Sequence, residues 1–141
     1  MKILLLNGVN MNMLGKRDAN LYGSDTLQTL QQEVVAFAKT LGIQVECQQS
    51  NSEGTLVDIL QQTTADAIVF NAGAYSHYSI ALRDCIECIS VPVVEVHMTD
   101  IYKRECFRHV DVLKDVCVAQ FLGKGVQSYL DAVAFLAKEQ Q

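Results

Sequence analysis

Short runs of apolar residues alternate along this chain with longer segments in which apolar residues recur every three or four positions. The short runs are bounded by turn residues and are typical of buried strands, whereas the longer period is typical of amphipathic helices. Five strands are predicted, at residues 3–6, 43–47, 67–70, 91–96 and 116–119. Helices are predicted at residues 27–41, 52–64, 80–88 and 126–138, and residues 97–110 are predicted to be polar and partly helical.

This alternation restricts the fold more than any other feature of the sequence. Strands that alternate with helices form parallel sheets with right-handed crossovers. Five such strands favour an α/β fold of the flavodoxin-like kind, a doubly wound five-stranded parallel sheet with strand order 2-1-3-4-5 and helices on both faces. A chain of 141 residues is long enough to bury a substantial core, so we predict a single domain over residues 1–141.

Composition argues against several classes of protein. Half of the residues are apolar and one is proline, which argues against disorder. The formal net charge is −5 and no basic cluster is present, so neither nucleic acid nor a membrane surface is expected as a partner. No apolar run approaches the roughly 18 residues that a membrane span needs, and the N-terminal run is too short for a signal peptide. We therefore expect a cytoplasmic protein.

The five cysteines are consistent with a reducing compartment. Their odd number and apolar neighbours favour reduced, mostly packed thiols. Cys85 and Cys88 have the spacing of a redox motif or of half a zinc site, but no second pair stands at ligand spacing. We predict that they pack as small hydrophobic residues, and a redox function is the alternative.

Ligands of doubly wound sheets bind outside the carboxyl ends of the strands, near the point where the winding changes direction. In this chain that rule selects residues 7–22, 71–77 and 95–100, at the ends of the first, third and fourth strands. The first segment is long for a connection in a compact α/β unit, and such loops are usually functional lids or disordered. We expect it to lie over a pocket.

Arg17 and Tyr22 lie in this long segment, between Gly15 and Gly23. A neutral phenol is a poor base, but a nearby cation favours its phenolate form. A guanidinium is suited to this role because it stays charged and does not give up a proton. Tyr22 is therefore a candidate base assisted by Arg17, and the alternative is a half-buried loop tyrosine beside a solvated arginine.

Glu95 and His97 share a face of the fourth strand, because side chains two residues apart in a strand point to the same side. The carboxylate is expected to orient the imidazole and raise the pKa of His97, which would suit a general acid at neutral pH. An ordinary histidine at a strand end is the alternative. Asn71 and His77 are polar groups after the third strand, where hydrogen bonds to the loop backbone compete with ligand binding.

The cations near these segments indicate the charge of a ligand. Arg17 and Arg108, together with His77 and His97, would make a locally positive pocket in an acidic protein. Such a pocket suits a small anionic, hydroxylated substrate. Taken singly, the arginines of the second half of the chain would be expected on the surface: Arg83, Arg104 and Arg108.

Common catalytic motifs are absent from the sequence. It contains no Gly-x-Ser-x-Gly elbow, no Walker motif and no Gly-x-Gly-x-x-Gly pattern. The three histidines do not have the spacing of metal ligands. The chemistry that remains is acid–base catalysis, for which we expect neither a metal nor a cofactor.

Three motifs resemble those of the type II 3-dehydroquinate dehydratases, and the resemblance covers nearly the whole chain, from Ile3 to Leu136. The first comprises Asn7-Gly8-Val9-Asn10, Leu14-Gly15-Lys16-Arg17 and Tyr22-Gly23. The second comprises Phe70-Asn71-Ala72-Gly73-Ala74-Tyr75-Ser76-His77 and Ala81-Leu82-Arg83-Asp84. The third comprises Glu95-Val96-His97, Arg104-Glu105 and Phe107-Arg108.

The resemblance implies loss of water from 3-dehydroquinate to give 3-dehydroshikimate, through an enolate and without an imine, in the shikimate pathway of aromatic amino-acid biosynthesis. Tyr22 would be the base, Arg17 would keep it ionised, and Asn10 would hold a water on the enolate oxygen. His97, oriented by Glu95, would protonate the departing hydroxyl. The substrate-binding residues would be Asn71, His77 and Arg108 for the hydroxyls, and Met98, Thr99 and Asn71 for the carboxylate.

The resemblance also implies a homo-oligomer, typically a dodecamer built from trimers, in which Asp84 reaches the site of a neighbouring subunit. The chain departs from the family pattern at several positions, and these put affinity and lid closure in question rather than the reaction. Val9 replaces a usual proline, Asp18-Ala19 a usual Glu-Pro, Asp100 an asparagine, Tyr102 a frequent histidine and Asp111 a serine.

The alternative function is a flavodoxin-like binding or regulatory module that holds a small anion without turnover. The joint presence of Arg17, Tyr22 and His97 distinguishes the two, because a binding protein needs no base and acid on opposite sides of a ligand.

Overall fold

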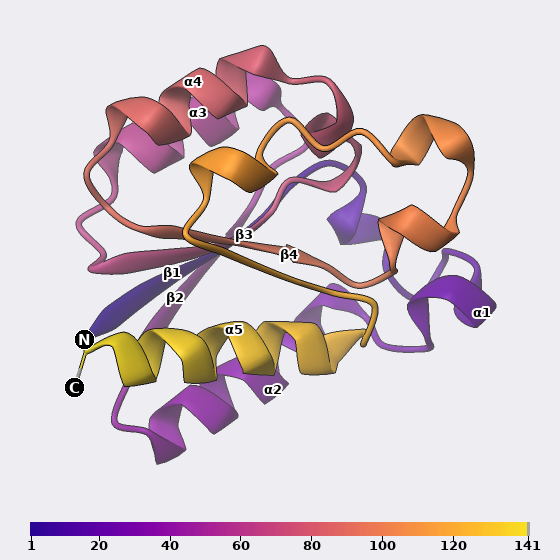
Figure 1. The fold of residues 1–141 in the computed structure, drawn as a ribbon. Coiled ribbons are helices and arrows are strands. Elements are labelled where there is room, and N and C mark those ends of the chain that lie inside the picture. Colours follow the sequence, from indigo (N-terminus) through magenta and orange to yellow (C-terminus); the bar gives the residue numbers. More distant parts are fainter. Residues whose placement is uncertain (141) are drawn as a thin grey trace.

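The computed structural model describes residues 1–140 as a five-stranded parallel sheet with helices on both faces (Figure 1). The strand order is β2-β1-β3-β4-β5, which confirms the predicted doubly wound topology. All four pairs of neighbouring strands are parallel. The strands are β1 (Lys2–Asn7), β2 (Gln44–Gln49), β3 (Ala67–Asn71), β4 (Val93–His97) and β5 (Ala119–Leu122).

Helices α2 and α5 lie on one face of the sheet, and α3 and α4 lie on the other (Figure 1). Short 3-10 turns follow β1, β3 and β4 at the carboxyl ends of these strands, and one more precedes β5. Among residues 1–140, no helix combines the length and apolar character that crossing a membrane requires. The α-helices are α1 (Ala19–Tyr22), α2 (Leu27–Thr40), α3 (Glu53–Gln62), α4 (Ile80–Cys88) and α5 (Val126–Glu139). The 3-10 turns are η1 (Met11–Met13), η2 (Gly73–His77), η3 (Ile101–Lys103), η4 (Cys106–Arg108) and η5 (Lys114–Val116).

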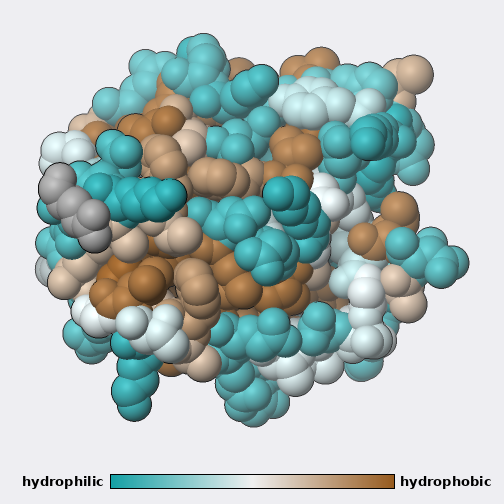
Figure 2. Space-filling view, turned by 60° about the horizontal axis from the view of Figure 1, so that its bottom comes forward, coloured by the Kyte–Doolittle hydropathy of each residue, from teal (hydrophilic) through white to brown (hydrophobic). Residues whose placement is uncertain are grey.

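The central strand β1 supplies both halves of the core. Ile3 and Leu5 are fully buried against the α2 and α5 side, whereas Leu4 and Leu6 are fully buried against the α3 and α4 side. Burying one such aliphatic side chain contributes roughly 1.5–3 kcal/mol. On the α5 side, Phe121 packs against Phe135, and apolar surface shows between polar side chains in Figure 2.

The strand bounds differ from the predicted ones by up to three residues, and among the strand starts those of β4 and β5 differ most. The last strand is predicted at residues 116–119, but β5 begins at Ala119 because Lys114–Val116 forms the turn η5. Pairing with β4 starts after this turn, where the backbone N–H of Val118 donates to the carbonyl oxygen of Val93. Residues 116–117 are apolar because they pack on the α3 and α4 side as a loop. The fourth strand begins at Val93 rather than residue 91, after Pro92.

The loops that follow β1 and β3 pack backbone against backbone. A Cβ atom placed on Gly8 would lie 2.6 Å from the carbonyl oxygen of Ala72. A Cβ atom on Gly73, whose φ is +64°, would lie 2.7 Å from the carbonyl oxygen of Val9. Glycine is therefore required at both positions, and the two loops form one wall at the carboxyl edge of the sheet.

We predict that Gly8→Ala lowers the free energy of unfolding by about 1–3 kcal/mol, because the added methyl group has to displace backbone atoms. The measurement is urea denaturation. Gly54→Ala is the matched control, since Gly54 lies in α3 and a Cβ there meets no atom within 4 Å. The control should raise the free energy of unfolding by roughly 0.5–1 kcal/mol. Equal stabilities of the Gly8 variant and the parent would contradict the packing argument.

Candidate active site

A pocket of about 460 Å³, partly open to solvent, lies at the carboxyl ends of β1, β3 and β4. This is the edge that the strand-order rule selected. Nine of the eleven predicted site residues line it. These nine are Asn10, Arg17, Tyr22, Asn71, His77, His97, Met98, Thr99 and Arg108.

The segment between β1 and α2 brings Tyr22 to the pocket. The side chain of Asp18 accepts a hydrogen bond from the backbone N–H of Asn20 and starts the short helix α1. Gly23, with a φ of +75°, ends that helix directly after Tyr22. Part of the predicted lid is therefore ordered by its own capping interactions.

Two guanidinium groups hold the phenol oxygen of Tyr22. Nη2 of Arg17 donates to it at 2.7 Å, and Nη1 of Arg104 donates to it at 2.8 Å. The Arg17 guanidinium also lies over the ring, 3.8 Å from its centroid. Burial lowers the pKa of Arg17, but an arginine remains a cation at neutral pH. Two charged donors thus converge on one phenol oxygen, and charge-assisted hydrogen bonds of this kind are stronger than neutral ones.

Arg104 is a site residue that the sequence reasoning assigned to the surface. Its side chain is 12 % exposed, and it lies in the segment that returns over the pocket from β4. Its contact with Tyr22 joins residues 82 positions apart, so no local spacing indicates it. The only signal was its place in the third motif of the resemblance, beside Glu105.

His97, which also lines the pocket, forms the predicted pair with Glu95. Nε2 of His97 lies 2.7 Å from Oε2 of Glu95, and the two side chains are 6 % and 1 % exposed. The predicted rise in the pKa of His97 is wrong, because burial lowers the pKa of His97 to about 4. Burial also raises the pKa of Glu95. The free-energy cost of burying an imidazolium and a carboxylate exceeds the attraction between them, so the imidazole is neutral at neutral pH.

Asp111 joins this pair, although no sequence argument placed it in the site. Its Oδ2 lies 3.9 Å from Nε2 of His97, and its side chain is 2 % exposed. Burial and the neighbouring Glu95 raise the pKa of Asp111 to about 7. Glu95, His97 and Asp111 each place one ligand atom within 4.8 Å of the others. Two carboxyl groups therefore converge on one imidazole, an arrangement that their spacing in the sequence did not indicate.

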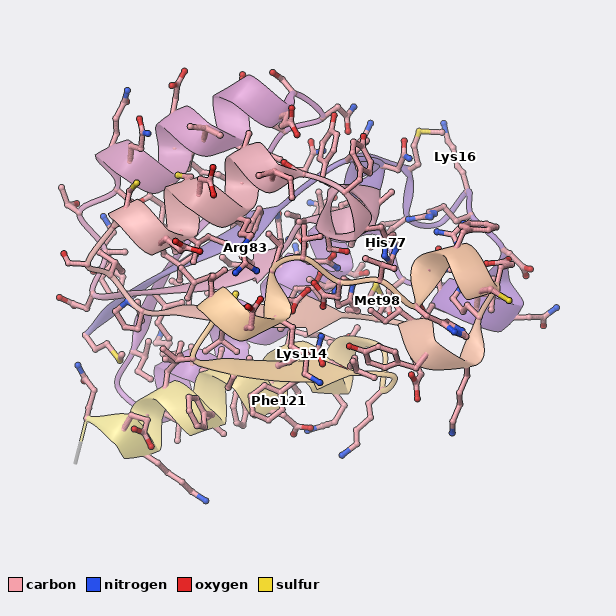
Figure 3. The ribbon with its side chains drawn as sticks, turned by 45° about the horizontal axis from the view of Figure 1, so that its top comes forward. Lys16, His77, Arg83, Met98, Lys114 and Phe121 are labelled. Carbon is pink, nitrogen blue, oxygen red and sulfur yellow. The ribbon has the colours of Figure 1, made fainter. Side chains whose placement is uncertain are left out.

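The polar side chains at and after the end of β3 use some of their hydrogen-bonding groups within the protein. Both amide hydrogens of Asn71 are directed inward, to the hydroxyl of Tyr129 at 2.8 Å and the sulfur of Met11 at 3.6 Å. Nδ1 of His77 lies 2.8 Å from the carbonyl oxygen of Val110, which leaves Nε2 of His77 as the nitrogen for a ligand. His77 and Met98 approach the same region from η2 and the end of β4 (Figure 3).

Residues from the segments that follow β1 and β4 complete the rim of the pocket. Asn10 has a φ of 67°, and its backbone N–H donates to the side chain of Asn51 at 3.0 Å. Asparagine tolerates this left-handed conformation better than most residues. Oγ1 of Thr99 lies 3.4 Å from Nη1 of Arg104, and Nε of Arg108 donates to Glu105 at 2.6 Å.

Two predicted site residues, Glu95 and Asp84, do not line the pocket. Glu95 acts from behind His97, whereas Asp84 is exposed on α4 outside the pocket of its own chain. The neighbouring Arg83 turns to Asp115 and lies apart from His77 (Figure 3). Any part of Asp84 in a site therefore requires a second subunit.

The cysteines lie outside the pocket. Cys85 is buried and Cys88 is exposed on the same helix α4, and burial raises the pKa of the Cys85 thiol. A raised thiol pKa disfavours the reactive thiolate, which argues against the redox alternative. Cys47 and Cys117 are half-buried, Cys106 is exposed, and all five thiols are free.

Comparison with known proteins gives a consistent result. The sequence pattern of the family described as Dehydroquinase class II matches residues 1–137. A 3-dehydroquinate dehydratase from Pelotomaculum thermopropionicum is 48 % identical over 135 residues, which cover 94 % of each chain. The crystal structure of a type II dehydroquinase from Butyrivibrio crossotus has a TM-score of 0.93 and 41 % identity, covering 96 % of this chain and 97 % of that one. A type II dehydroquinase from Propionibacterium acnes has a TM-score of 0.93 and 34 % identity, with 97 % and 96 % covered. The chain belongs to the class II dehydroquinase family.

Proposed function

We propose that this chain is a hydro-lyase that converts 3-dehydroquinate to 3-dehydroshikimate in the shikimate pathway. The observation that carries this proposal is the pairing of a phenol held by two guanidinium groups with a buried imidazole across one pocket. Family membership and the dehydratase relatives support it. A protein that only bound an anion would need cations but neither a base nor an acid.

Tyr22 begins the proposed reaction as a phenolate. It takes a proton from the carbon beside the ketone, and an enolate forms. Arg17 and Arg104 favour the anionic phenol before this step and remain close as negative charge moves to the substrate. Asn10 lines the same pocket and holds the water that donates a hydrogen bond to the enolate oxygen.

His97 completes the reaction by protonating the hydroxyl that leaves as water. Glu95 fixes the ring through Nε2 at 2.7 Å, so Nδ1 is the nitrogen that can face the substrate. Among residues 1–140, no lysine lines the pocket, in keeping with a route through an enolate rather than an imine. We propose no role for a metal or a cofactor in these steps.

The substrate is an anion with several hydroxyl groups, and the pocket is lined by cations and polar groups. Arg108 and His77 are proposed to bind hydroxyls, and Thr99 with Met98 the carboxylate. Asn71 is proposed to contribute after its amide turns from Tyr129 toward the pocket.

We further propose that the whole chain acts as one catalytic domain in a cytoplasmic homo-oligomer, a dodecamer by analogy with the family. Large apolar side chains are exposed next to the pocket segments, including Tyr78, Ile80, Phe107 and Val110. A contact between subunits would cover these groups and would bring Asp84 of one subunit to the pocket of another. The five free thiols are in keeping with a reducing compartment.

The proposed function predicts that the purified protein converts 3-dehydroquinate to a product with conjugated enone absorbance. Tyr22→Phe should lower kcat by at least about 100-fold, because the base is lost, and should change KM by only a few-fold. Tyr102→Phe is the matched control, since Tyr102 is 39 % exposed and does not line the pocket. Binding without turnover by the parent protein would reject the enzyme in favour of an anion-binding module, and undiminished turnover by the Tyr22 variant would reject the mechanism.

Arg104→Met should lower kcat roughly 10- to 100-fold at pH 7, because one of the two cations that favour the phenolate is removed. Activity should recover partly as the pH is raised, since hydroxide then removes the phenol proton without the cation. The measurement is the pH dependence of kcat. Lys103→Met removes a neighbouring cation that is 84 % exposed and should leave the profile unchanged. Identical profiles of the two variants would contradict the role assigned to Arg104.

A further inference from the structure

The carboxyl group of Asp111 lies behind His97, buried and outside the pocket lining. The amide of Gln120, which projects from β5, connects it to Glu95. Nε2 of Gln120 donates to Oε1 of Glu95 at 3.1 Å and to Oδ2 of Asp111 at 2.7 Å. Two carboxyl groups that are 1 % and 2 % exposed thus converge on one neutral amide and one imidazole.

The surroundings provide little positive charge to compensate two buried anions. Lys114 of η5 acts on Glu95 only as a distant charge, and it makes no ion pair among residues 1–140. The backbone N–H of Leu113 donates to Oδ1 of Asp111 at 2.9 Å. Burial and the nearby carboxylates raise the pKa of the Cys117 thiol, so that group stays neutral.

Two further groups act on the cluster from outside it. His77 of η2 stacks on His97 with ring centroids 6.4 Å apart. Asp115 is exposed beyond Cys117 and is paired with Arg83. The Arg83 guanidinium is thus already paired outside the cluster. Like charges that meet in a buried site do not both ionise, and one proton is then held between them.

We propose that Asp111 and Glu95 share one proton, and that this pair delivers it to Nε2 of His97 when His97 protonates the departing hydroxyl. Asp111 is then a positioning residue, which sets where the proton resides. The sharing of the proton is independent of the reaction, whereas its delivery rests on the proposed function.

The transfers balance within the site. The Nδ1–H bond of His97 breaks as a new O–H bond forms on the leaving group, which departs as water. The proton on Oε2 of Glu95 moves to Nε2, so the imidazole stays neutral and the carboxyl pair becomes doubly ionised. Solvent then returns one proton to Nδ1 of His97 while the proton on Nε2 moves back to the carboxyl pair, and Tyr22 releases to solvent the proton that it took from carbon. No oxidant, metal or cofactor is required.

The direction of the pKa changes agrees with this placement of the proton. Burial lowers the pKa of His97 to about 4 and, with the charge of Glu95, raises the pKa of Asp111 to about 7. At neutral pH the carboxyl pair therefore holds the proton more readily than the imidazole does.

The first test is the pH dependence of kcat in Asp111→Asn, which keeps the shape of the side chain but cannot hold the proton. We expect its alkaline limb to move to lower pH by at least about one unit, with kcat at pH 7.5 reduced roughly tenfold. KM should stay within about twofold, because Asp111 does not line the pocket. Asp111→Ser should behave alike and serves if the asparagine variant folds poorly. Asp58→Asn removes an exposed charge from α3 and should follow the parent profile.

The second test needs no catalytic activity. The folded-state pKa of Asp111 lies above its unfolded value, so the native protein binds the extra proton between about pH 4 and pH 7. Stability from this group is therefore present below that window and is lost as the pH rises through it. Between pH 5 and pH 8 the Tm of the parent should fall more steeply than the Tm of Asp111→Asn. The Tm of Asp58→Asn should fall as steeply as that of the parent.

Parallel Tm curves for the parent and Asp111→Asn would overturn the shared proton, whether or not the protein is a dehydratase. An active parent whose kcat profile coincides with that of Asp111→Asn would overturn the delivery step while leaving the proposed function intact. Loss of activity on treatment with EDTA, restored by Zn²⁺ alone, would place a metal ion between the carboxyl groups and would also overturn the inference.

Discussion

The contact of one phenol oxygen with two guanidinium groups is the interaction on which the site depends. Arg17 comes from the segment after β1, and Arg104 comes from the segment after β4. Their meeting on Tyr22 therefore creates the proposed base and closes the pocket from two sides at once. Because both donors are charged, the two hydrogen bonds are charge-assisted and fix the position of the phenol oxygen.

The opposite wall of the pocket follows a different physical rule. Tyr22 is half-buried and is controlled by nearby cations, whereas His97 and its two carboxyl neighbours are controlled by removal from water. On this side burial decides which group carries the proton, and the attraction between an imidazolium and a carboxylate is too weak to reverse the result. Charge therefore controls one side of the pocket and burial controls the other.

Local patterns were sufficient for the strand order and for the residues at the carboxyl edge. The apolar runs identified β1 and β3, and the short spacing of Arg17 and Tyr22 indicated their contact, on which the proposed base depends. Contacts between distant residues could not be derived in this way. Arg104 reaches Tyr22 across 82 positions, and Asp111 meets Glu95 only because β5 and its preceding loop pack against β4. The sign of the pKa change at His97 was missed for the same reason, since burial is a property of the assembled fold. The start of β5 was misplaced because apolar loop residues that pack inward look like a strand.

The close approach of Gly8 to Ala72 and of Gly73 to Val9 has a consequence for how this protein can change over generations. Neither glycine can gain a side chain without a matching alteration in the opposite loop. Natural variation in substrate preference should then accumulate in the segments that carry Arg17 and Arg104. The loops around Gly8 and Gly73 should instead change together.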